Sequence, residues 1–282
     1  MPMVTGDTEP EQQMLVQWCM SAQVFSEPEF RQTIRRIHCI DEGKDMEEIL
    51  PVVEQINGSM SAFSLELRSA MDQTSGVRMW ALVNTNADPI SIGATPYTAS
   101  ELIMLKTLVE GVFTEGSGNY SMSFHDALRL ATKRGGTRAE VESLLRRFTG
   151  DGWLALDEGF VVLGARSIIE LQSYFNTGFA DYIRLCSLCK EMATSGVVCM
   201  ECQEAVHPYC AGRVAEANGG QLSCPKCNRH IRQPWKFGPG ERGVPHALES
   251  GALEAKEENV GVEEPATQSI KKLRIEDSSD EE

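Results

Sequence analysis

The sequence predicts an α+β chain of several domains, and three observations carry this prediction. First, an order of three amphipathic helices and a β-hairpin occurs twice within the first 165 residues. Second, seven of the nine cysteines and one histidine lie between residues 186 and 227, in pairs separated by two residues. Third, residues 238–282 are acidic and poor in large apolar side chains, which is typical of a disordered tail. A chain of 282 residues has room for two or three domains.

A first winged-helix domain is predicted for residues 10–85, after a disordered start at 1–9. Apolar residues recur at helical spacing and then alternate at period two, which indicates helices followed by a hairpin. We expect the helices at 11–23, 26–37 and 45–56 and the strands at 63–68 and 79–83. Ser26 is the expected cap of the second helix, and Pro51 bends or divides the third.

A second winged-helix domain is predicted for residues 100–165, after a linker at 86–99 that contains Pro, Thr and Ser. Each of its three helices begins at a hydroxyl side chain that can cap the backbone. These caps are Ser100, Ser123 and Thr137. A hairpin over 153–163 completes the domain. The apolar pattern then predicts one further helix within a connecting segment at 166–182.

The paired Cys and His residues predict two zinc sites in a module at 183–237. Two intervening residues let both members of a pair reach one metal ion, and tetrahedral sites with three or four thiolates suit zinc. The eight expected ligands are Cys186, Cys189, Cys199, Cys202, His207, Cys210, Cys224 and Cys227. In a cross-braced module, the first and third pairs share one ion and the second and fourth share the other. Each site then has four protein ligands, so both metal ions are structural.

A disulfide framework is the alternative for the clustered cysteines. The first ten residues, MPMVTGDTEP, have neither the basic nor the apolar part of a secretion signal. No stretch approaches the ~18 apolar residues of a membrane span. We therefore expect a reducing compartment, in which clustered cysteines hold metal. The two remaining cysteines, Cys19 and Cys39, lie in helical stretches and are expected to be small buried apolar residues.

The order of four Cys, one His and three Cys is used by two kinds of module. PHD fingers read histone tails, and variant RING domains recruit a charged ubiquitin-conjugating enzyme. PHD fingers usually have a large aromatic residue two positions before the seventh ligand, where this chain has Leu222. Tyr209 is the only aromatic residue between Cys189 and Cys224, so a cage for a methylated lysine is not expected. The RING domain is the favoured interpretation, and the PHD finger is the alternative.

Three residues are the expected contacts with the conjugating enzyme. Leu188 lies between the first two ligands and Pro225 follows the seventh, as in RING domains, although local packing is the alternative role for both. Many active RING domains also have a cation directly after the eighth ligand. Here Asn228 occupies that position, and Arg229 follows one residue later. A RING domain supplies no nucleophile, so no catalytic residue is expected, and its effect lies in positioning.

The charge distribution argues against strong direct binding of nucleic acid. The formal net charge is −15 at pH 7, whereas affinity for phosphates comes from cationic contacts. The basic stretch 133–138 is a candidate phosphate contact, with a solvated turn as the favoured interpretation. In the tail, residues 271–274 are a candidate nuclear-import signal, and Ser278 and Ser279 precede acidic residues as kinase sites do. Protein binding suits the winged-helix domains better than DNA binding.

The whole arrangement resembles the non-SMC element one family over residues 10–237. The likeness rests on the two winged-helix domains, the Cys-Ser-Leu-Cys motif at 186–189 and the His-Pro-Tyr-Cys motif at 207–210. Members of this family are variant-RING subunits of the SMC five/six genome-maintenance complex.

The resemblance implies a nuclear, chromatin-associated protein of DNA repair and recombination. It also implies that the chain binds a MAGE-family winged-helix protein and a kleisin, and that the MAGE partner enhances its ubiquitin ligase activity. The alternative is a structural assembly subunit whose RING-like module is only a docking surface.

Overall fold

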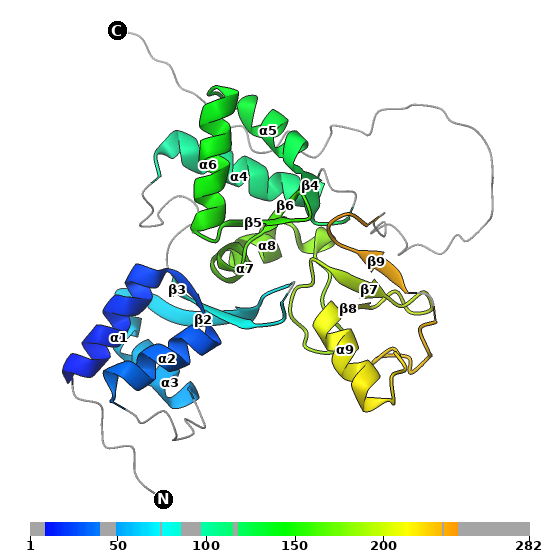
Figure 1. The fold of residues 1–282 in the computed structure, drawn as a ribbon, viewed down its shortest axis with the longest axis horizontal. Coiled ribbons are helices and arrows are strands. Elements are labelled where there is room, and N and C mark those ends of the chain that lie inside the picture. The colour runs from blue at the N-terminus through cyan, green and yellow to red at the C-terminus, as the bar shows by residue number, and fades with distance from the viewer. Residues whose placement is uncertain are drawn as a thin grey trace, which may run out of the picture. The chain divides into compact units, whose positions relative to one another are not determined.

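The computed structural model describes residues 9–39, 49–73, 75–85, 97–114, 118–232 and 234–241. These residues form two winged-helix units, two short connecting helices and a cysteine-rich module (Figure 1), which confirms the predicted fold class. No helix in the described part of the chain is long and apolar enough to cross a membrane. Several predictions lie outside the described residues: the disordered start up to residue 8, residues 86–96 of the linker and residues 242–282 of the disordered tail, with the import signal at 271–274 and the kinase sites Ser278 and Ser279.

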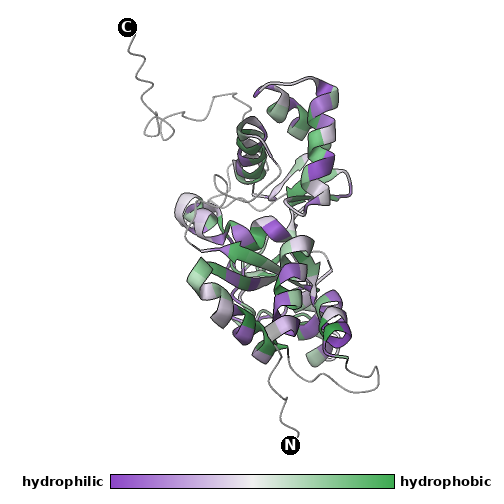
Figure 2. Ribbon diagram, turned by 90° about the vertical axis from the view of Figure 1, so that its left-hand side faces the viewer, coloured by the Kyte–Doolittle hydropathy of each residue, from purple (hydrophilic) through white to green (hydrophobic). Residues whose placement is uncertain are grey.

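The first unit has the helix and strand order of a winged helix. Its helices are α1 (Glu9–Ala22), α2 (Glu27–Ile37), α3 (Leu50–Met60) and the 3-10 turn η1 (Ser61–Phe63). Its antiparallel sheet has the order β1 (Val24–Ser26), β3 (Arg78–Asn84), β2 (Leu65–Met71). The helices alternate between hydrophilic and hydrophobic residues (Figure 2), and their apolar side chains pack on this sheet. Phe30 lies at the centre of this core, with ring contacts to Trp18, Phe25 and Trp80 at centroid distances of 5.3–6.2 Å.

The structure differs from the sequence-based prediction of the first unit in three ways. Helix α3 begins at Leu50, with Pro51 in its first turn. Proline is tolerated there because the N–H groups of the first turn make no hydrogen bond within the helix. Phe63 lies in the 3-10 turn and is 70% exposed, so the strand begins only at Leu65. Cys19 is buried as expected, but Cys39 is exposed, because it follows the end of α2 in a left-handed conformation (φ 49°).

The second unit repeats this order. Its helices are α4 (Ala99–Thr114), α5 (Phe124–Thr132) and α6 (Arg138–Gly150). Its antiparallel sheet has the order β4 (Ser121–Ser123), β6 (Phe160–Leu163), β5 (Leu154–Asp157). The short strands β1 and β4 were not predicted, because three residues are too few to show an alternating pattern.

Hydroxyl caps fix the helix starts of both units. Ser26, Ser123 and Thr137 cap α2, α5 and α6 as predicted. The cap of α4 is Thr98 and not Ser100. The Thr98 hydroxyl accepts from the Glu101 N–H (3.3 Å), and the Glu101 carboxylate accepts from the Thr98 N–H (2.7 Å). This reciprocal pair needs an acid three residues after the cap, a spacing that Thr98 meets and Ser100 does not.

The single connecting helix expected after the second unit is divided at Leu171 into α7 (Ala165–Glu170) and α8 (Gln172–Gly178), followed by the 3-10 turn η2 (Ala180–Tyr182). The division lets the residues of this segment pack on both winged-helix units. Leu171 and Phe175 are buried in the core of the second unit, whereas Ile169 packs with Ala81 and Val83 of β3 in the first unit.

A buried ion pair fixes α7 between the two winged-helix units. The Arg166 guanidinium contacts Glu170 at 2.6 Å, and their side chains are only 7% and 11% exposed. The same guanidinium donates to the Gln23 side-chain oxygen at 2.5 Å and lies 4.2 Å from the centroid of the Trp153 ring. Burial raises the pKa of the Glu170 carboxyl, and the charge of Arg166 opposes that rise.

We expect Arg166→Met to destabilise the chain by about 3 kcal/mol, because it leaves the Glu170 carboxylate buried without its partner. The measurement is urea unfolding followed by circular dichroism. Arg146→Met is the matched control, since Arg146 forms the same kind of i,i+4 pair with Glu142 but is 74% exposed, and it should change stability little. Equal losses for the two variants would contradict a structural role for the buried pair.

Candidate metal centre

The cysteine-rich module is built from short elements around eight candidate ligands. It contains β7 (Gly196–Val198), β8 (Ala205–Val206), α9 (Pro208–Ala217) and β9 (Trp235–Phe237), and its sheet has the order β8-β7-β9. The structure gathers the ligands into two groups. One group is Cys186, Cys189, His207 and Cys210, and the other is Cys199, Cys202, Cys224 and Cys227. Within each group the candidate ligand atoms lie within 4.8 Å of one another, so the division is that of a cross-braced module.

Three of the four pairs are held by the same backbone turn. In the first, the Cys186 N–H donates to the Glu191 carbonyl, and the Lys190 N–H donates to the Cys186 carbonyl, both at 2.9 Å. The turns that start at Cys199 and Cys224 repeat both hydrogen bonds at the same spacing. The fourth residue after the first cysteine is left-handed in every case, with φ of 65° at Lys190, 60° at Gln203 and 57° at Asn228. These turns direct both sulfurs of a pair to one point, as zinc knuckles do.

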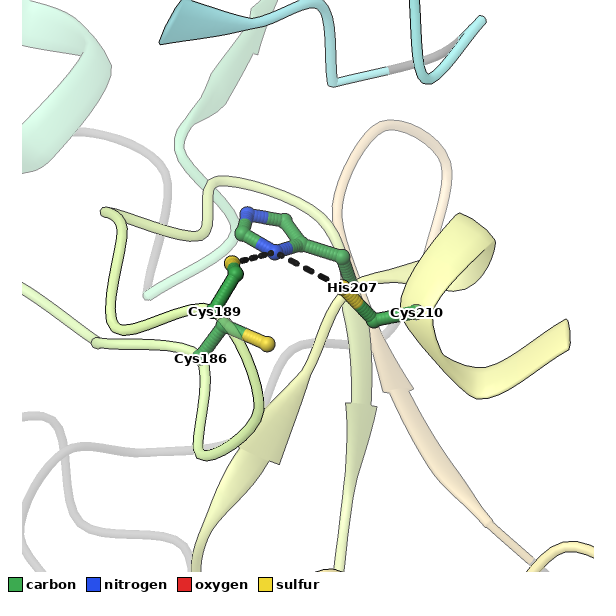
Figure 3. Close-up of side chains that lie close together, drawn as sticks. All are labelled: Cys186, Cys189, His207 and Cys210. Atoms are coloured by element: carbon green, nitrogen blue, oxygen red, sulfur yellow. Dashed lines mark hydrogen bonds between the residues drawn. The ribbon is translucent and has the colours of Figure 1, made fainter. Parts of the chain in front are cut away.

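The remaining pair, His207 and Cys210, lies at the start of a helix. His207 is the N-cap residue of α9, and Cys210 follows within the first turn (Figure 3). A carbonyl oxygen can only accept, so the Nε2 of His207 donates its proton to the Met192 carbonyl at 3.0 Å. This bond leaves the lone pair of Nδ1 free on the side of the cluster, 3.3 Å from Cys189 Sγ and 4.0 Å from Cys210 Sγ. A ligating histidine held by its other nitrogen is the usual arrangement in metal sites.

The protonation of the thiols fits a bound cation. Burial, together with the neighbouring sulfurs, raises the pKa of the Cys202 thiol to about 12. In contrast, a hydrogen bond from the Arg229 N–H is the main cause that lowers the pKa of Cys227. Four sulfurs this close repel one another as thiolates, and a divalent cation removes that repulsion. The donor sets of three sulfurs with one imidazole nitrogen and of four sulfurs are both suited to zinc.

The predicted enzyme-contact residues lie on two knuckles that meet at one strand. Leu188 is 40% exposed, Pro225 is half-buried, and Arg229 is exposed and paired with Glu201 at 2.7 Å. The Ser187 N–H, next to Leu188, donates to the Ala205 carbonyl at 2.8 Å. The Lys226 ammonium, next to Pro225, binds the carboxylate of Glu204. Consecutive residues at the start of β8 thus hold both knuckles.

The basic stretch 133–138 forms the exposed turn between α5 and α6. The cations that follow it on α6 are engaged, because Arg146 pairs with Glu142 and Arg147 with Glu101, each at 2.6 Å. This pairing accords with a solvated surface.

Comparison with known proteins matches both parts of this architecture. Residues 12–132 match the family model described as the Nse1 non-SMC component of the SMC5-6 complex, and residues 186–227 match the model of a RING-like domain. The second match supports the RING interpretation of the ligand order over the PHD finger.

Curated relatives carry the same family name. The Nse1 protein of Schizosaccharomyces pombe, non-structural maintenance of chromosomes element 1, is 28% identical over 185 residues, covering 65% of this chain and 79% of its own. The human homologue is 25% identical over 197 residues, covering 68% and 73%. A solved chain of an Nse1-Nse3-Nse4 complex has the same fold, with a TM-score of 0.67 and 24% identity over 81% of this chain and 99% of that one.

Sequence reasoning named the ligands but missed the residues around them. Met192, which orients His207, and Glu204, which binds Lys226, carry no local pattern that marks these roles. Tyr209 was weighed only as a cage residue, whereas its ring stacks on His207 at a centroid distance of 4.7 Å.

We expect Cys202→Ser to lose the metal ion of the four-sulfur site and to keep the other, because each group supplies its own four ligands. The measurement is elemental analysis of zinc per chain in the purified full-length protein. Cys39→Ser is the matched control, since Cys39 is an exposed cysteine outside both groups, and it should retain the zinc content of the unmodified chain. Unchanged zinc in Cys202→Ser would contradict this ligand assignment.

Proposed function

We propose that this chain is the RING-type ubiquitin ligase subunit of an SMC5-6 complex. The observation that supports the proposal is the cross-braced pair of ligand groups, in which the knuckles of Leu188 and Pro225 contact the consecutive residues Ala205 and Glu204. Two ions of zinc would be bound, one by each group. The family match over residues 12–132 supports the assignment to this complex.

The chemistry of such a subunit lies in positioning. Zinc supplies structural cross-links only, because each group has four protein ligands and no position remains for water. Leu188 provides an apolar contact for the conjugating enzyme, and Pro225 shapes the turn between Cys224 and Cys227. Holding the charged enzyme and its thioester in one geometry favours attack by the substrate amine. No side chain of this chain takes up or gives a proton in that step.

The partners follow from the same assignment. A solved structure that shares this fold is an Nse1-Nse3-Nse4 complex, whose other members are taken to be a MAGE-family protein and a kleisin. The winged-helix units of this chain would bind the MAGE protein, consistent with the acidic composition and the ion-paired cations of α6. A role in DNA repair and recombination in the nucleus, with DNA contact shared with these partners, completes the proposal.

Leu188→Ala should slow discharge of ubiquitin from charged conjugating enzymes at least about tenfold, because truncating a central apolar contact weakens the encounter by that order. The assay uses the purified chain with its MAGE and kleisin partners and a panel of conjugating enzymes. Leu156→Ala is the matched control, since Leu156 is a comparably exposed leucine on β5, away from the metal groups. Equal rates for the unmodified chain and Leu188→Ala, at equal zinc content, would argue against the ligase assignment.

A second candidate function is a docking module that assembles the complex without transferring ubiquitin. One observation favours it: Asn228 stands where active RING domains have a cation, and Arg229 is engaged by Glu201 at 2.7 Å. In this case Leu188→Ala would leave assembly and repair unchanged in cells, whereas deletion of residues 183–237 would dissolve the complex with the MAGE protein and the kleisin.

A cation introduced at position 228, directly after the eighth ligand, distinguishes the ligase from the docking module. Asn228→Arg should raise ubiquitin discharge, because it places a charge directly after the eighth ligand, where it can bridge the conjugating enzyme and ubiquitin. The left-handed turn accepts long side chains, since Lys190 and Gln203 occupy the same position in the other knuckles. Asn228→Gln, which has the same backbone demand and no charge, is the control. No gain over the control would favour the docking module.

A further inference from the structure

The wing of the first winged-helix unit makes a buried polar contact with the cysteine-rich module. This wing comprises residues 72–77, between β2 and β3, with Thr74 outside the description. Gln73 is only 8% exposed, and its side-chain oxygen accepts from the Thr194 N–H at 3.0 Å. The Ser195 hydroxyl donates to the Gln73 carbonyl at 3.3 Å. Both hydrogen bonds tie the wing to the segment that leads into β7.

A second contact of the wing reaches a residue beside a metal ligand. A Cβ atom at Gly76 would lie 2.8 Å from Cβ and 2.9 Å from Cγ of Tyr209, and Gly76 has a φ of +67°. The backbone of the wing therefore lies directly against the Tyr209 side chain. The same ring stacks on His207, with a centroid distance of 4.7 Å and an interplanar angle of 15°.

The two contacts converge on His207 from different directions. The imidazole is held on one side by Tyr209, which the wing covers at Gly76. On the other it is held by the Met192 carbonyl, in the segment 191–195. The first unit contacts both ends of that segment, because the Glu191 carboxylate accepts from the Met71 N–H at the end of β2 (3.4 Å) and Gln73 of the wing binds Thr194. Both supports of the imidazole thus contact the first winged-helix unit. Hydrogen bonds within the module, from Cys186 to Glu191 and from Ala193 to Arg184, hold the segment as well.

The supports of the four-sulfur group come from within the module. Its two knuckles are closed by the same turn hydrogen bonds as the Cys186 knuckle, from Cys199 to Glu204 and from Cys224 to Arg229. Ion pairs of Lys226 with Glu204 and of Arg229 with Glu201 add to them. These supports come from the module itself.

We propose that the wing of the first winged-helix unit is an outer support of the three-sulfur, one-nitrogen metal site, with Gln73 and Gly76 as its positioning residues. The inference rests on the proposed function only in requiring a metal ion at that site. The placement of Leu188, between the first two ligands of the same site, is then coupled to the first winged-helix unit. The four-sulfur site is independent of the wing.

The test compares the two sites within one full-length chain. Cadmium replaces zinc, and cadmium NMR resolves the two sites because their donor sets differ in one nitrogen ligand. In Gln73→Met and in Gly76→Ala, competition with a chelator should show about tenfold weaker binding at the three-sulfur, one-nitrogen site, the low end of what loss of an outer support costs. Binding at the four-sulfur site should stay at the level of the unmodified chain.

Matched variants separate this effect from a general loss of stability. Gln12→Met removes the same side-chain amide from the first unit, where Gln12 donates to the Gln55 carbonyl far along the chain from the metal ligands. Gly219→Ala imposes the same left-handed strain (φ +64°) within the cysteine-rich module, where the added Cβ meets nothing within 4 Å. Neither control should shift the balance between the sites.

Two outcomes would overturn the inference: equal weakening of both sites in Gln73→Met and Gly76→Ala, or unchanged binding at both. The two variants act through different contacts, so failure of one to fold leaves the other to decide. The readout is metal occupancy and not ubiquitin transfer. An unmodified chain that binds two ions but discharges no ubiquitin would therefore contradict the ligase proposal and leave this inference intact.

Discussion

The cysteine-rich module depends on bringing eight side chains to two points. Its strands have two or three residues each, too few to define a fold by pairing alone. Its buried apolar residues, among them Val198, Val206 and Phe237, belong to the same core cluster as the second winged-helix unit. The described residues of the module thus contain no large apolar core of their own. A core shared with the winged helix stabilises the module, and metal ions bound by the two ligand groups would add the cross-links that small domains require.

The sequence predicted the parts of this fold that are encoded locally. Zinc knuckles follow from pairs of cysteines two residues apart, and Ser123 and Thr137 mark helix starts because a cap acts within four residues. The break at Leu171 was missed, because the apolar pattern of each half alone predicts a helix. The break arises because the two halves pack on different units. The contact of Gln73 with Thr194 was missed for a similar reason. It joins residues 121 positions apart, and neither carries a pattern that points to the other.

Positioning is the common theme of the polar contacts between the units. Arg166 contacts the buried carboxylate of Glu170, the side-chain amide of Gln23 and the ring of Trp153 at once. These contacts favour one position of the first winged-helix unit against α7. The wing then meets the module at Gln73 and Gly76, where a glycine allows an approach that a larger residue would block. The proposed function of holding a conjugating enzyme in place would gain from such rigid contacts, since small displacements of a contact residue weaken that effect.

The long separation between the wing and its contacts has a consequence for how the protein is made. A chain emerges from the ribosome with its N-terminal domain first, and that domain generally folds as a unit. The wing is therefore in place before Thr194 and His207 are synthesised, more than 120 residues later in the case of Thr194. The nascent module meets a preformed surface that favours one arrangement of the three cysteine thiols grouped with His207. Mispairing of these thiols, with each other or with the wrong metal ion, is thereby disfavoured during biosynthesis.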